Sequence, residues 1–248
     1  KSAWNFIFNK MNMNKYSTQG LKDDINLFVE KQTKVPFTMR NIYKMIEIIV
    51  GTHSQRMDKA LLEVFDKLTA HYSDNRYNVE GWKTNSHYLV NEKFIFPSIF
   101  EVTYGGSLGM RYGWRDGETL KDFVKALCYL TGTDYDDLVD LQYAFGFNKW
   151  VYCDGEIVAI DNGYGSKKVA GEESLSALKE KNPNKLYELR DKPTFGEWFD
   201  FGFFVVKGFK KGTGHFKFKD RDVWALFNQN IARIKGFPLP EAVKPKTK

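Results

Sequence analysis

A cluster of basic residues follows an aromatic-rich segment near the C-terminal end of the chain, in the sequence KGFKKGTGHFKFKDR. Side chains alternate between the two faces of a strand, so a strand over 215–219 places His215, Lys217 and Lys219 on one face. Phe216 and Phe218 then lie on the other face, which is predicted to be core. Lysine ammonium groups bind phosphates and release counterions, so the basic face is predicted to contact a nucleic-acid backbone. The candidate nucleic-acid-binding residues are Lys207, Lys210, Lys211, His215, Lys217, Lys219 and Arg221.

The positive charge of the chain is concentrated in the same region. Residues 201–248 hold 11 Lys and Arg and three acidic residues, a net charge of +8, whereas the whole chain carries +6. A basic segment of this kind favours a polyanionic partner, either DNA or RNA. The alternative interpretation is a solvated sheet face whose lysines maintain solubility and prevent edge pairing. The residue types fit both interpretations.

Phosphodiester hydrolysis is the second interpretation of this segment. His215 could act as an acid or base together with carboxylates from elsewhere in the chain. The nearest acids have another explanation, because Asp220 is placed to cap a helix and Asp222 falls in the first turn of that helix. The four histidines and two cysteines show no zinc-ligand spacing. The chain is therefore predicted to be non-catalytic, with no catalytic residue, no metal site and no cofactor.

Helices are expected to dominate the first 75 residues. Apolar residues at helical spacing predict a helix over 18–33 and a long helix over about 40–72 that is capped by Thr38. A further helix is expected around 4–11. Pro36 lies in a short connection, so the two longer helices are expected to form an antiparallel hairpin or part of a small bundle. This helical surface is also a candidate protein-interaction module, which is a third interpretation of the function.

The following residues, 76–240, are expected to form an α+β part with a mixed, mainly antiparallel sheet. Strands are predicted at 88–90, 94–96, 100–104, 149–153 and 156–160, the last two joined by an Asp-Gly turn. Helices are predicted at 118–131, 134–145 and 172–181. The C-terminal unit is a strand, a turn, a second strand and a helix. Strands do not alternate regularly with helices, which argues against a parallel α/β sheet.

The composition is that of a folded protein, with 42% apolar and 16% aromatic residues. No apolar run approaches the roughly 20 residues that a membrane helix needs, and no signal peptide is visible. We therefore expect a cytoplasmic protein with no membrane partner. The expected parts are a helical part over 1–75, an α+β part over 76–240 and a disordered basic tail over 241–248, the first two being alternatively one continuous domain.

The C-terminal segment also carries a family resemblance. The sequence KGFKKGTGHFKF at 207–218 is followed by Phe227–Asn228 within a helix and by Leu239–Pro240. This order resembles the C-terminal signature of the bacterial family called domain of unknown function 4942. The long helix followed by an α+β part is similar to that family as well, so the resemblance is expected to span most of the chain.

Individual residues match the family pattern to different degrees. Gly212, His215 and Phe218 match it, whereas Lys211 and Thr213 stand where the family often shows asparagine. The resemblance implies a protein of bacterial chromosomes, plasmids or phages, in some members joined to a DNA-methyltransferase-like domain. It therefore implies an accessory role in a mobile-element or DNA-modification system, with a DNA-methyltransferase-like domain or another protein as partner.

Overall fold

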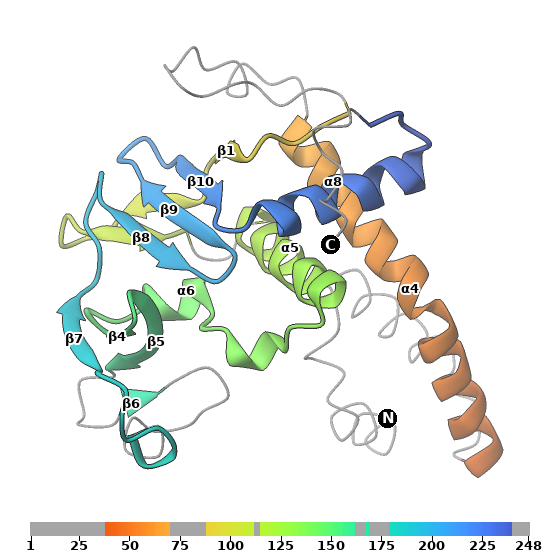
Figure 1. Ribbon diagram of the computed structural model, residues 1–248, viewed down its shortest axis with the longest axis horizontal. Helices are drawn as coiled ribbons and strands as arrows, with labels where there is room; N and C mark the ends of the chain where they lie inside the picture. Colours follow the sequence, from red (N-terminus) through yellow and green to blue (C-terminus); the bar gives the residue numbers. More distant parts are fainter. Residues whose placement is uncertain (1–37, 70–87, 112–114, 162–166, 169–178, 240–248) are drawn as a thin grey trace.

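The computed structural model describes residues 38–69, 88–111, 115–161, 167–168 and 179–239 (Figure 1). The helices are α4 (Met39–Thr69), α5 (Arg115–Thr131), α6 (Leu141–Ala144) and α8 (Arg221–Lys235), with a 3-10 helix η2 (Tyr135–Asp137). The strands are β1 (Lys93–Phe96), β2 (Phe100–Val102), β3 (Leu108–Met110), β4 (Lys149–Cys153), β5 (Glu156–Asp161), β6 (Lys167–Lys168), β7 (Glu188–Asp191), β8 (Trp198–Phe201), β9 (Phe204–Gly208) and β10 (Gly214–Phe218). No helix in these ranges has the length and hydrophobicity to cross a membrane.

The main sheet has eight strands in the order β1-β10-β9-β8-β5-β4-β7, with β6 paired to β5. Neighbouring strands are antiparallel except β5 and β8, which are parallel. Strands β2 and β3 form a separate hairpin. The predicted α+β class with a mixed, mainly antiparallel sheet is therefore confirmed.

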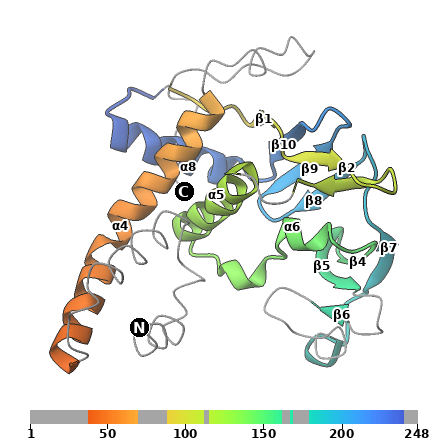
Figure 2. The same ribbon diagram turned by 180° about the vertical axis from the view of Figure 1, so that it is seen from behind.

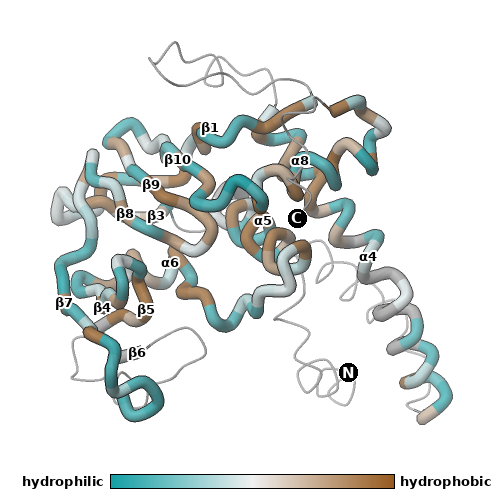
Figure 3. The backbone as a smooth tube through the Cα atoms, in the orientation of Figure 1, coloured by the Kyte–Doolittle hydropathy of each residue, from teal (hydrophilic) through white to brown (hydrophobic). Residues whose placement is uncertain are grey.

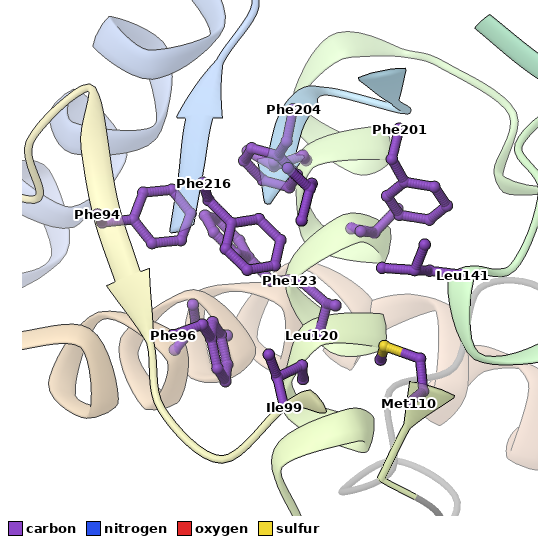
Figure 4. Packing of buried hydrophobic residues seen from close by; sticks show 14 of the residues in the cluster. Phe94, Phe96, Ile99, Met110, Leu120, Phe123, Leu141, Phe201, Phe204 and Phe216 are labelled. Atoms are coloured by element: carbon purple, nitrogen blue, oxygen red, sulfur yellow. The ribbon is translucent and has the colours of Figure 1, made fainter. Parts of the chain in front are cut away.

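Aromatic side chains join the sheet to α5. Phe94 of β1 stacks on Phe216 of β10 with 5.3 Å between ring centroids, and Phe123 of α5 lies 6.0 Å from Phe94 (Figure 4). Phe204 of β9 closes the group at 5.4 Å from Phe123. Each of these rings is at most 2% exposed, and burial of large apolar side chains is the main favourable term in folding.

Helix α5 lies between the sheet and α4, as both views of the ribbon show (Figures 1 and 2). Helix α4 packs against α5 and α8, and its buried residues Leu61, Phe65 and Leu68 belong to the same apolar cluster as the sheet. The hydrophobic segments of α5 and of the strands accordingly gather in the interior (Figure 3). The described part of the predicted helical region therefore shares its core with the α+β part, while the domain boundaries stay a prediction.

The predicted long helix is confirmed as α4. Thr38 caps it, since the Asn41 N–H donates to the Thr38 Oγ1 at 3.3 Å and the Ile42 N–H donates to the Thr38 carbonyl oxygen. The helices predicted at 4–11 and 18–33 lie outside the described residues, as does the tail. The helix predicted at 172–181 is described only from 179 to 181, where the backbone is helical.

The single helix predicted over 134–145 is wrong. Asp134 caps only the short η2, accepting from the Asp136 N–H at 2.9 Å, and Leu138 is extended with φ −102° and ψ 138°. Asp140 then caps α6 by accepting from the Tyr143 N–H at 3.1 Å. Aspartate side chains compete for backbone N–H groups, so the second cap starts a new helix instead of continuing the first.

Two strand assignments also need correction. The first strand of the C-terminal unit was predicted as one aromatic-rich strand before the Lys/Gly turn. It is instead the end of β8 and β9, joined by a turn at Gly202 with φ 51°. The strand predicted over 88–90 is a turn and a single bridge residue, Leu89. In contrast, the predicted Asp-Gly turn between β4 and β5 is confirmed, with φ 53° at Asp154 and 84° at Gly155.

Candidate nucleic-acid interface

The face of the sheet that points away from α5 carries two rows of side chains across β1, β10, β9 and β8. Cross-strand partners lie on the same face of an antiparallel sheet. The first row consists of Ile95, His215, Lys207 and Trp198. The second row consists of Lys93, Lys217, Val205 and Asp200. We call these residues the open face, because each is half-buried or exposed whereas the other face forms the core.

Aromatic and cationic groups are interleaved on the open face and the turn beside it. The Lys217 Nζ lies 3.9 Å from the centroid of the Trp198 ring, and the Lys207 Nζ lies 5.5 Å from it. Lys207 is also 5.7 Å from the ring of Phe209, which in turn lies 4.4 Å from the His215 ring. Trp198 is 39% exposed, so part of its ring remains available to solvent beside two ammonium groups.

The structure brings some of the predicted binding residues together. Three of them lie on the open face: Lys207, His215 and Lys217. Lys210 and Lys211 lie in the turn between β9 and β10 and are exposed. The Lys210 Nζ is 5.9 Å from the Phe195 ring, so this lysine borders the same surface.

The remaining two predicted residues are paired with acids. Lys219 forms an ion pair with Glu156 of β5. At the start of α8, the Arg221 Nε lies 3.2 Å from the Glu92 Oε1. The Arg221 Cζ lies 5.9 Å from the centroid of the Trp224 ring. Because both side chains are ion-paired and neither belongs to the two rows of the open face, they lie at the margin of the candidate interface.

One basic and two aromatic side chains at this surface were not identified from the sequence: Lys93, Trp198 and Phe209. Lys93 begins the segment KFIF, in which phenylalanine occupies every second position as in HFKFK, and this was a usable signal for the two faces of the strand. What the sequence hides is the register that pairs β1 with β10 and so brings Lys93 opposite Lys217. Trp198 was missed because β8 was not separated from β9.

The open face is positive at one side and acidic at the other. Lys93, Lys207 and Lys217 lie on β1, β9 and β10, and Asp200 lies on β8. In the parallel pair, Glu156 of β5 lies opposite Asp200. The part of the sheet formed by β1, β10 and β9 is therefore the positive side of the open face, and Trp198 of β8 lies at its acidic border.

The imidazole of His215 is neutral at physiological pH. Burial and the nearby Lys207 lower its pKa from 6.5 to about 4. A neutral imidazole can donate or accept one hydrogen bond but does not attract phosphate as a cation. A carboxylate partner of the kind that hydrolysis requires would raise this pKa. Within the described residues, no group of three or more His, Cys, Asp and Glu side chains could hold a metal ion.

The lowered pKa of His215 predicts a pH-dependent contribution to stability. The His215 imidazole binds a proton near pH 6.5 in the unfolded chain and only near pH 4 in the folded protein, so its protonation favours unfolding. The free energy of unfolding is therefore unaffected by His215 above pH 6.5 and decreases as the pH drops toward 4. We expect His215→Gln to lose less stability than the wild type between pH 7.5 and pH 5 in urea unfolding. An NMR titration of the His215 ring with a midpoint at or above 6.5 would contradict this assignment.

Two parts of the C-terminal signature have a structural explanation. Gly212 has φ 89°, and its carbonyl oxygen accepts from the Phe100 N–H at 3.0 Å, so the β9–β10 turn is held against the β1–β2 connection. Asn228 is fully buried in α8 and bonds both backbone groups of Val90. These residues position the open face and do not form part of it.

A family model described as Domain of unknown function (DUF4942) matches residues 1–145 of the chain. The described part of the match runs from α4 to the end of α6. The resemblance predicted from the sequence is thus confirmed, although the signature at 207–240 lies beyond the matched residues. No curated protein and no solved structure matches the chain.

Proposed function

We propose that this chain, which belongs to the domain family DUF4942, binds nucleic acid through its open face. We further propose that it does so without catalysis, as an accessory module of a bacterial mobile-element or DNA-modification system. The accessory role is inferred from the resemblance alone, as is a DNA-methyltransferase-like domain as a neighbour. The binding activity is inferred from the chemistry of the surface.

The observation that carries the proposal is the convergence of Lys93, Lys207 and Lys217 on one sheet face together with an exposed indole. None of the three forms an ion pair at 4.0 Å or less among the described residues, whereas Lys219 and Arg221 do. A lysine that binds a phosphate gives up its cation–π contact with a ring. That contact is weak, worth about 0.5–1 kcal/mol at exposed sites. The solvated-face interpretation explains the lysines equally well. The feature that favours nucleic acid is the exposed ring beside them, because bases stack on aromatic rings whose neighbouring cations bind the backbone.

The expected result is binding that weakens steeply with salt and depends on these lysines. Each phosphate contact contributes a slope of about −0.9 for duplex DNA and −0.7 for single strands in a plot of log K against log salt. We expect the double variant Lys207→Gln/Lys217→Gln to reduce the magnitude of this slope by about 1.4–1.8 and to weaken binding at low salt. Fluorescence anisotropy with labelled DNA and RNA oligonucleotides over a salt series measures both quantities.

A charge-matched control is available on α4. Arg40 and Lys44 are exposed on α4, which packs against α5 and α8. The variant Arg40→Gln/Lys44→Gln therefore removes the same charge outside the open face and is expected to leave the slope nearly unchanged. Equal effects of the two double variants would show that binding depends on the net charge of the protein and not on the open face. The absence of salt-dependent binding to any oligonucleotide would refute the proposal.

A further inference from the structure

We infer that the open face binds single-stranded nucleic acid, with a base stacked on the indole of Trp198 and the neighbouring phosphates held by Lys207 and Lys217. This inference rests on the proposed function and assigns it a ligand class and a contact. It adds a residue that no sequence motif indicated. The position, accessibility and present neighbours of Trp198 support it.

Trp198 projects from β8 at the border of the lysine-bearing strands. It is 39% exposed, and its cross-strand partner is Lys207. Phe209, which directly follows β9, adds a second ring, whose centroid lies 5.7 Å from the Lys207 Nζ. Every base has a π face, so an exposed ring flanked by cations binds successive bases of a strand with little sequence preference. Four-stranded sheets that bind single-stranded RNA stack two or three bases on aromatic rings in this way.

The ammonium group of Lys217 now lies over the Trp198 ring, at 3.9 Å from its centroid. A base that stacks on that side has to displace it. An exposed cation–π contact changes an equilibrium constant by about two- to fivefold, whereas stacking of one base on an aromatic ring contributes about 5- to 150-fold. The displaced ammonium group of Lys217 can bind the adjacent phosphate. Base stacking on the Trp198 ring is therefore more favourable than the cation–π contact that it replaces.

The shape of the surface favours a single strand over a duplex. Four strands at a spacing of about 4.8 Å form a surface about 14 Å across, before side chains are added. The major groove of B-DNA is about 12 Å wide and admits a helix or a two-stranded ribbon. In a duplex the bases also stack on each other, so the Trp198 ring would find no accessible base face. A duplex would use the lysines alone, whereas a single strand uses the lysines and the ring.

The test compares an ordinary single strand with an abasic strand of the same length and charge. We expect Trp198→Leu to weaken binding of the ordinary strand by about 5- to 150-fold and to leave binding of the abasic strand unchanged. Trp198→Phe keeps a π face and is expected to retain most of the affinity. Tyr143→Leu removes an exposed aromatic ring from α6, outside the open face, and is expected to leave binding of both strands unchanged.

A measurement on the wild-type protein does not depend on the stability of the leucine variant. The indole N–H resonance of Trp198, assigned as the signal missing from the Trp198→Phe spectrum, is expected to shift with the ordinary strand and much less with the abasic one. If lysine variants weaken binding but the abasic strand binds as tightly as the ordinary one, stacking is refuted and the proposed function stands. If no strand shows salt-dependent binding, both are refuted.

Discussion

Replacing Asn228 with leucine is expected to destabilise the protein by about 2–4 kcal/mol, although the substitution puts an apolar residue into an apolar site. The Asn228 side chain is fully buried in α8. Its Oδ1 accepts from the Val90 N–H at 2.9 Å, and its Nδ2 donates to the carbonyl oxygens of Val90 and Trp224, each at 3.1 Å. Leucine leaves the buried Val90 N–H without that acceptor, and an unsatisfied buried donor costs about 1–3 kcal/mol by itself.

Loss of the Asn228 side chain costs less at the two carbonyl oxygens that accept from it than at the Val90 N–H that donates to it. The Val90 carbonyl oxygen keeps a second bond, because the Trp224 Nε1 donates to it at 2.7 Å. The loss at Asn228 therefore falls mainly on one N–H group and on the packing of leucine against the chain before β1. Denaturant unfolding measures the change, which should appear in the midpoint with little change in the slope.

Asn230 provides the matched control for this prediction. It lies on the same helix, and its Nδ2 donates to the Leu226 carbonyl oxygen at 2.9 Å, but its side chain is only half-buried. We expect Asn230→Leu to change stability by no more than about 0.5 kcal/mol, as is usual at surface positions. Equal effects of the two substitutions would show that Asn228 acts through helix propensity and not through Val90.

Local sequence patterns correctly predicted two features of the C-terminal unit, the faces of β10 and the cap of α8. Alternation over 215–219 correctly assigned the two faces of β10, since Phe216 is fully buried and Lys217 is half-exposed on the other side. Asp220 was correctly assigned as the cap of α8, accepting from the Asp222 N–H at 2.7 Å. These features follow from neighbouring residues in the chain, and local rules are enough for them.

The candidate site needed information that neighbouring residues do not hold. The open face exists because β1 pairs with β10 and β8 pairs with β9, and each register brings together residues from separate segments. In the β8–β9 segment the apolar pattern continues through the turn at Gly202, so the turn and the exposure of Trp198 were hidden. Asn228 was hidden for a related reason, because its partner Val90 lies far away in the sequence.

Gly214, the first residue of β10, is the position where an added methyl group is expected to have the second large effect. A Cβ atom there would lie 2.6 Å from Phe216 Cε2 and 2.9 Å from both Ile99 Cγ2 and Phe100 Cε2. All three neighbours are at most 1% exposed, so none can move away into solvent. Overpacking of this kind typically costs about 1–3 kcal/mol, and we expect Gly214→Ala to destabilise by that amount and Gly214→Val by more.

The sign of the effect distinguishes overpacking from backbone entropy. Alanine in place of glycine normally stabilises a helix or strand by about 0.5–1 kcal/mol, because the unfolded chain loses freedom. Gly51 of α4 has nothing within 4 Å of the place that an added methyl group would take, so Gly51→Ala is expected to stabilise the protein by about that amount. If denaturant unfolding shows opposite signs at the two positions, glycine is required at 214 because the chain packs closely against Phe100. Stabilisation at both would mean that the aromatic core yields, and His215, the next residue, would then not be held by a fixed backbone.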